Sequence, residues 1–87
     1  MGRKAHDKRT ARRVGKVIAL RRSEIEKTIS ELASDAGFDL SQMRRIERGE
    51  SGTDLAGYAR IARALGWTPG EFLGLAFPTR TPQTNVE

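Results

Sequence analysis

The sequence predicts an all-α fold, a compact bundle of five short helices, from two kinds of observation. Apolar residues recur at the three- and four-residue spacing of a helix face, whereas strand-like alternation never persists beyond a few residues. Residues that start and stop helices divide these apolar stripes at short intervals. With 87 residues, 37% of them hydrophobic, the chain is long enough for one small domain with a thin core.

The first two helices are expected to precede and to follow a short joint near Lys27. The first begins near Asp7 or Thr10. Its apolar face carries Val14, Val17, Ile18 and Ile25. The apolar stripe of the second consists of Ile29, Leu32, Ala33 and Ala36. Both patterns are typical of amphipathic helices that bury one side against a shared core.

The start of the second helix is indicated by a capping box. In this motif the Thr28 hydroxyl accepts a backbone N–H, and the Glu31 carboxylate reaches back to the N–H of the cap residue. Ser23 and Glu26 fit the same pattern, so a start one turn earlier is the alternative. We favour Thr28.

Similar signals bound the three later helices. The residues that can cap the starts of the third, fourth and fifth helices are Asp39, Asp54 and Thr68. The glycines that can end the second, third and fourth are Gly37, Gly49 and Gly66. The fourth helix carries a stripe of Leu55, Tyr58, Ile61, Ala62 and Leu65. The fifth has Pro69 at its first position, followed by Phe72 and Leu73.

Positive charge is concentrated at the N-terminus. Residues 1–22 hold nine Lys and Arg against one acid, whereas residues 23–87 hold seven against ten acids. A clustered positive segment favours a polyphosphate partner, although a solubilising tail is the plainer interpretation for residues 1–9. We therefore expect a flexible basic arm over residues 1–9, a DNA-binding domain over residues 10–77, and a disordered tail over residues 78–87.

Several classes of protein are disfavoured by what the sequence lacks. It has no cysteine, and its one histidine, His6, has no neighbour at metal-ligand spacing, so neither metal nor cofactor is expected. The apolar runs are too short to cross a membrane, and no signal-peptide core follows the basic N-terminus, which favours a cytoplasmic protein. No nucleophile–base pair or phosphate-binding glycine loop indicates an enzyme.

The second and third helices have the dimensions of a helix-turn-helix motif. Thr28–Ala36 and Asp39–Arg48 are joined only by Gly37 and Phe38, and glycine is suited to the positive φ of such a turn. Ala33 is small enough for the steep crossing of the two helices. The apolar residues that would face inward are Leu32, Ala36, Phe38, Met43 and Ile46. A helical hairpin without a ligand is the alternative.

Three features of the chain resemble the Cro/C1-type helix-turn-helix family, over about residues 14–73. They are Gly37, the run RIERG at residues 45–49, and the run IARALG at residues 61–66. The resemblance implies a lambda-repressor-like fold that commonly binds operator DNA as a dimer. It places base-reading positions on Leu40, Ser41, Arg44 and Arg45, and phosphate contacts of the second helix on Thr28 and Ile29. It also places a structural ion pair on Arg22 and Glu47.

The chemistry of these side chains refines the expected roles. Arg44 and Arg45 can each donate two hydrogen bonds to a guanine edge, with phosphate contact or plain solvation as the alternative. Ser41 is short and can meet a base edge or a phosphate. Gln42 can touch backbone or base, whereas Arg48 follows the helix and favours phosphate. The basic residues that add sequence-independent attraction are Lys4, Arg9, Arg12 and Arg13.

Three departures from the family pattern matter. Ile29 stands where the family often has glutamine, so the side-chain contact to phosphate is in question and Ile29 can pack instead. Glu26 stands where the family often has the glycine that ends the first helix, which predicts a longer first helix. Leu40 cannot form hydrogen bonds, so it either touches a thymine methyl group or packs.

The expected function is that of a small prokaryotic or phage transcriptional regulator, with repression favoured. One module of this size buries limited surface, so we expect a dimer on DNA. The expected dimer surface is Phe72, Leu73, Leu75 and Phe77, with packing inside one chain as the alternative. A second function is an antitoxin-type interaction module that neutralises a toxin and represses its own operon, with residues 76–87 as the toxin-binding segment.

Overall fold

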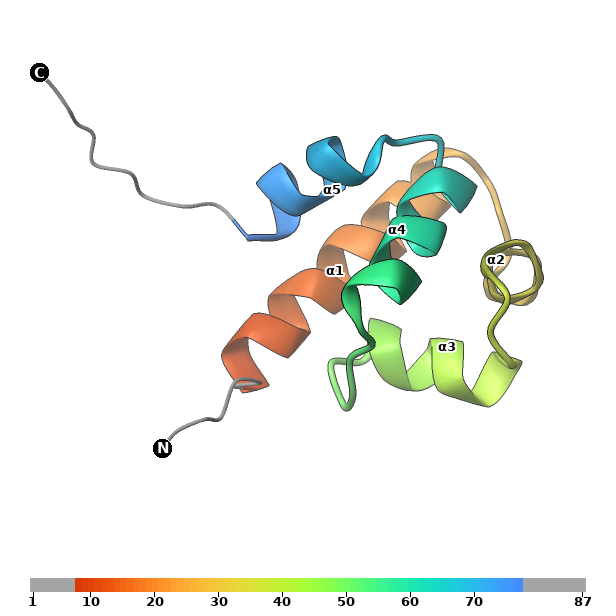
Figure 1. The fold of residues 1–87 in the computed structure, drawn as a ribbon. Helices are drawn as coiled ribbons and strands as arrows, with labels where there is room; N and C mark the ends of the chain where they lie inside the picture. The colour runs from red at the N-terminus through yellow and green to blue at the C-terminus, as the bar shows by residue number, and fades with distance from the viewer. Residues whose placement is uncertain (1–7, 78–87) are drawn as a thin grey trace, which may run out of the picture.

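A computed structural model describes residues 8–77 of the chain, and these residues form five helices (Figure 1). The helices are α1 (Lys8–Glu24), α2 (Ile29–Ala36), α3 (Leu40–Glu47), α4 (Leu55–Ala64) and α5 (Pro69–Ala76). The predicted all-α, five-helix architecture is therefore confirmed for this part of the chain. Among the described residues, no helix is both long and apolar enough to cross a membrane.

The start of α1 lies between the two positions expected from the sequence, Asp7 and Thr10. The helix begins at Lys8, so Lys8 and Arg9 are helical. Lys4 and His6 lie outside the described residues, as does the tail over residues 78–87.

Local capping explains where the other four helices begin. The side chains of Thr28, Asp39, Asp54 and Thr68 each accept the N–H of the residue three positions later. Thr28 and Thr68 complete the capping box, because Glu31 and Glu71 return a carboxylate to the cap N–H. Each cap contributes about 1 kcal/mol, enough to fix the first turn of an eight-residue helix. The start of α2 at Thr28 is confirmed, and Ser23 lies inside α1.

The end of α1 differs from the sequence prediction. The expected extension beyond the family position is wrong, because α1 ends at Glu24 and Glu26 has a φ of 56°, in the left-handed region. Glu26 donates its N–H to the Ser23 carbonyl, and Lys27 donates to the Arg22 carbonyl, so the chain turns here. An L-residue in this conformation is strained by about 1–2 kcal/mol.

Replacing Glu26 with glycine is expected to stabilise the domain by about 0.5–1 kcal/mol, because glycine adopts a positive φ without steric strain but has more freedom in the unfolded chain. Urea denaturation followed by circular dichroism measures the change. Glu26→Ala is the matched control, since it removes the same exposed side chain and keeps the strain. Equal stabilities for the glycine and alanine variants would contradict this interpretation.

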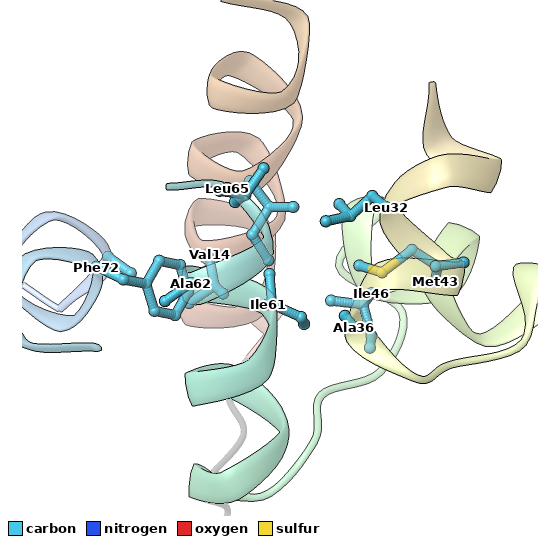
Figure 2. Packing of buried hydrophobic residues seen from close by; sticks show 12 residues of the cluster. Val14, Leu32, Ala36, Met43, Ile46, Ile61, Ala62, Leu65 and Phe72 are labelled. Carbon is cyan, nitrogen blue, oxygen red and sulfur yellow. The ribbon is translucent and has the colours of Figure 1, made fainter. Parts of the chain in front are cut away.

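The core draws side chains from all five helices. Figure 2 shows the α4 residues Ile61 and Ala62 between Phe72 on one side and Leu32 and Ile46 on the other. The fully buried hydrophobic residues are Val14, Ile18, Leu32, Ala33, Ala36, Met43, Ile46, Ile61, Ala62, Leu65, Phe72 and Ala76. Two residues expected on the apolar faces are exposed instead. Ile25 follows the end of α1, and Leu55, 68% exposed, occupies the first position of α4 beyond the edge of the core.

The helix-turn-helix geometry is fixed at Gly37 and Phe38. Figure 1 shows α2 end-on and α3 lengthwise, so the two helices cross steeply. Gly37 has the expected left-handed φ of 78°, and the Phe38 N–H donates to the Ala33 carbonyl at 2.8 Å. Arg60 of α4 lies 5.0 Å from the centre of the Phe38 ring and donates to the Ala36 carbonyl. The turn is therefore attached to the rest of the core through α4.

The N-terminal half of α1 supports the C-terminal end of α3 by direct backbone contact. A Cβ atom at Gly15 would overlap the carbonyl oxygens of Ile46 and Glu47. A Cβ atom at Gly49 would lie 2.7 Å from the Arg12 Cα. Two glycines thus allow α1 and the end of α3 to approach more closely than any side chain would permit.

Candidate nucleic-acid interface

The outer face of α3 is a stripe of polar side chains at helical spacing. Its members, at positions i, i+3, i+4 and i+7, are Ser41, Arg44, Arg45 and Arg48, and all four are exposed. Met43 and Ile46, on the opposite side, are fully buried. Packing of these two residues therefore determines which side of α3 faces outward. We call these four residues the α3 stripe.

The two central arginines have no partner in the described part of the chain. Within residues 8–77, neither the Arg44 nor the Arg45 guanidinium forms a hydrogen bond or ion pair. Their donors are accordingly directed to solvent. An arginine presents five N–H donors in a planar fork, the arrangement that suits two-point contacts to a guanine edge or a phosphate.

The remaining predicted contacts of α3 lie at its two ends. Leu40 and Gln42, in the first turn, are half-buried, and the Gln42 N–H donates to the Asp39 carboxylate. Leu40 thus keeps part of its side chain open to a partner. Arg48 caps the C-terminus of α3, and its Nε lies 3.4 Å from the Glu50 carboxylate. That pair is well exposed, so it holds Arg48 only weakly.

The basic residues of α1 lie at its exposed N-terminal half. Arg9, Arg12 and Arg13 are exposed, and Arg12 lies against the end of α3, where a Cβ atom at Gly49 would be 2.7 Å from its Cα. Lys8 joins Arg12 and Arg48 around one hollow beside the α3–α4 loop. Sequence reasoning did not include Lys8 among the basic contacts. Its spacing of four residues from Arg12 was the available signal.

At the N-terminus of α2, the phosphate-contacting position expected at Ile29 can donate only through backbone N–H groups. The Ile29 side chain packs against the core, which is the alternative that the sequence left open for it. Only the backbone N–H groups of the first helical turn remain to meet an anion at this position. The Thr28 hydroxyl accepts the Glu31 N–H at 3.0 Å, which leaves its own O–H as a donor.

The structure brings Arg22 and Glu47 together between α1 and α3. Arg22 Nε lies 2.7 Å from Glu47 Oε2, and a second hydrogen bond of 3.0 Å joins Nη2 to Oε1. The Arg22 side chain is 23% exposed and the Glu47 side chain 9%. The hydrogen bond with Glu47 raises the pKa of Arg22 above its ordinary value. The paired carboxylate is thus turned inward, away from the α3 stripe.

The residues expected at a dimer surface divide into two groups. Phe72 is fully buried and packs 5.7 Å from the ring of Tyr58 and 6.1 Å from that of Trp67, so its assignment to an exposed surface is wrong. Leu73 is half-buried, whereas Leu75 and Phe77 are exposed. An apolar groove of about 420 Å³ runs between α4 and α5. Residues that line it include Leu55, Ala56, Ala59, Pro69 and Leu73.

These features define the class of protein. A steeply crossed helix pair, with a buried side and an exposed stripe of arginines, is the arrangement of helix-turn-helix DNA-binding regulators. Residues 18–77 match the Cro/C1-type HTH DNA-binding domain family, and the chain belongs to that family. The resemblance inferred from the sequence and the lambda-repressor-like fold are therefore confirmed.

Solved structures support the fold. Two crystal structures of the clp gene regulator ClgR from Corynebacterium glutamicum are similar, each with 22% sequence identity. One gives a TM-score of 0.72 and covers 77% of this chain and 71% of that chain. The other gives a TM-score of 0.71 and covers 85% of this chain and 96% of that chain. No curated protein matches the chain.

Proposed function

We propose that this chain is a transcriptional repressor of prokaryotic or phage type that recognises operator DNA in the cytoplasm as a dimer. The observation that carries the proposal is the α3 stripe, whose two central arginines are unpaired within the described residues. An exposed helix of this kind fits the major groove of B-DNA, where each base pair presents a distinct pattern of donors and acceptors.

Positions along α3 assign different roles to its side chains. Ser41, Arg44 and Arg45 occupy its first two turns and would read base edges, with Leu40 beside them to contact a thymine methyl group. Gln42 and Arg48 would contact the backbone. Thr28 and the first N–H groups of α2 would bind a second phosphate through hydrogen bonds and the positive end of the helix dipole.

A dimer is supported by the apolar surface between α4 and α5. This surface includes the exposed Leu55 of α4 together with Pro69 and the half-buried Leu73 of α5. Pairing two copies through it would leave both α3 helices free. Half-sites about 34 Å apart would place them on one side of the duplex. The same apolar groove also suits an antitoxin-type role, which co-purification of a toxin partner would indicate.

A selection of bound sequences from random DNA, repeated with Arg44→Ala and Arg45→Ala, tests the proposed roles. A base-reading arginine is expected to lose about 1–3 kcal/mol of discrimination at one position, roughly 5- to 150-fold. A phosphate contact would instead weaken all sequences alike. Arg63→Ala is the matched control, because it removes the same charge from the end of α4, far from α3.

The dependence of affinity on salt gives an independent check. Phosphate contacts release bound counterions, so the logarithm of the association constant should fall linearly with the logarithm of salt concentration. The slope is expected to become less negative by about 1 when Arg48 or Arg12 is replaced with alanine. A wild-type slope near zero would rule out the proposed interface.

A further inference from the structure

A second concave site lies beside the DNA-reading face. This hollow, of about 880 Å³, is bounded by the N-terminal half of α1, the α3–α4 loop, the start of α4 and Phe77 at the end of α5. Sites for small organic molecules commonly have volumes of about 300–1,000 Å³. The hollow is built partly from residues 8–14, which precede the segment that matches the family.

The hollow combines positive charge with an apolar interior. Lys8, Arg12 and Arg48 contribute three cations, and Glu50, paired with Arg48 at 3.4 Å, contributes one carboxylate. Two positive charges therefore remain uncompensated among the charged residues that line it. Apolar surface is supplied by Val14, Tyr58 and Phe77. This combination suits a molecule that carries both an acidic group and a hydrocarbon or aromatic body.

The α3–α4 loop lies against Tyr58, one of the residues that line the hollow. A Cβ atom at Gly52 would lie 2.8 Å from the Tyr58 hydroxyl, so the glycine allows the loop to pass directly over it. Burial raises the pKa of Tyr58, and a hydrogen bond with the Thr53 backbone partly opposes that shift. The protonated phenol supplies a polar group beside the ring surface.

We propose that this hollow binds a small organic anion, with its acidic group held by Arg12, Arg48 and Lys8 and its apolar body against Val14, Tyr58 and Phe77. A carboxylate, sulfonate or phosphate ester satisfies the same donors, because each presents oxygen atoms to the guanidinium forks.

Binding of such an anion would regulate attachment to DNA. Arg12 and Arg48 are also the proposed phosphate contacts nearest the end of α3, so a bound anion occupies the donors that the duplex needs. Its negative charge also repels the phosphates. This regulatory consequence rests on the proposed function, whereas binding of the anion does not.

The test uses a matched pair of probes, 8-anilinonaphthalene-1-sulfonate and its uncharged counterpart N-phenyl-1-naphthylamine. Fluorescence titration of the full chain is expected to show at least about tenfold tighter binding of the sulfonate, because three cations surround the site. Amide NMR signals of Gly49, Gly52 and Tyr58 should shift on binding. Equal affinity for the two probes would overturn the proposal.

Two substitutions that fill space locate the bound probe. Ala11→Trp blocks the hollow from α1, and Ala56→Trp blocks the apolar groove between α4 and α5. We expect at least about tenfold weaker sulfonate binding in the first variant and little change in the second. Ser51→Trp, from the loop, provides a second way to fill the hollow if Ala11→Trp does not fold. Loss of binding in Ala56→Trp alone would place the probe in the groove and overturn the proposal.

DNA binding distinguishes failure of this inference from failure of the proposed function. The sulfonate probe should weaken DNA affinity several-fold in the wild-type chain and leave Ala11→Trp unaffected. A chain that binds the probe in the hollow but never binds DNA would refute the repressor and retain the anion site. If DNA binds and the probe does not, the anion site is refuted alone. The DNA affinity of Ala11→Trp without probe is the reference for this comparison, because Arg12 and Arg48 line the hollow and are also proposed phosphate contacts.

Discussion

Replacement of Gly15 with alanine is expected to destabilise the domain by about 3 kcal/mol, although alanine is the better helix former. The new Cβ atom would overlap two backbone carbonyl oxygens at the end of α3, those of Ile46 and Glu47. Backbone atoms cannot turn aside as a flexible side chain can, so α1 and α3 must separate. Separation opens the core around Ile18 and Ile46, both fully buried. Urea denaturation measures the loss.

Gly74 in α5 offers a matched control for this substitution. A Cβ atom there meets none of the described atoms within 4 Å. Gly74→Ala is therefore expected to stabilise the domain by about 0.5–1 kcal/mol, through helix propensity and the reduced freedom of the unfolded chain. We therefore expect Gly15→Ala to lower the free energy of unfolding and Gly74→Ala to raise it. If Gly15→Ala also stabilised the domain, the close approach of α1 and α3 would be wrong.

The parts of the fold that local chemistry determines could be predicted from the sequence. Thr28, Asp39, Asp54 and Thr68 all cap the helices expected of them, because a cap depends on a residue and its neighbour three positions later. The division of α3 into a buried and an exposed side was likewise predictable, since helical periodicity alone separates Met43 from the arginines.

The sequence predictions failed where the burial or backbone conformation of a residue depends on contacts with residues far away in the chain. In the two-turn helix α5, apolar residues occur all round, so periodicity cannot tell that Phe72 and Ala76 face inward while Leu75 faces outward. Leu55 fits the stripe of α4 but lies past the end of the core. Glu26 has a left-handed conformation because the chain must turn from α1 into α2, a requirement that the glutamate itself does not indicate although the family often has glycine at this position.

In the candidate site, too, the features set by local sequence were predictable and those set by distant contacts were not. Its arginines were identifiable by residue type and spacing, but the hollow beside them was not, because it joins α1, a loop and the end of α5. The close approach at Gly15 was equally hidden. An isolated glycine within a helix gives no indication of which backbone lies against it. Such features depend on how helices pack, which the pattern of a single chain does not specify.

The Arg22–Glu47 pair is expected to be the ionic interaction that most strongly positions α3. Replacing either residue with alanine leaves its partner partly buried and unpaired, which should cost about 2–3 kcal/mol of folding free energy. The loss is smaller than for a fully buried pair because the Arg22 side chain is 23% exposed. Arg22 also donates to the Lys27 carbonyl at 3.0 Å, so Arg22→Ala should be the more damaging substitution.

A double-mutant cycle isolates the interaction itself. We expect a coupling free energy of about 1.5–2.5 kcal/mol between Arg22 and Glu47, measured by urea denaturation of the two single variants and the double variant. The exposed pair Arg48–Glu50, whose side chains are 62% and 53% exposed, is the matched control and should couple by about 0.5 kcal/mol or less. Equal coupling in the two pairs would show that α3 is held by its apolar contacts alone. Strong coupling only at Arg22 and Glu47 would show that the pair adds to the packing of Met43 and Ile46 in holding α3 against α1.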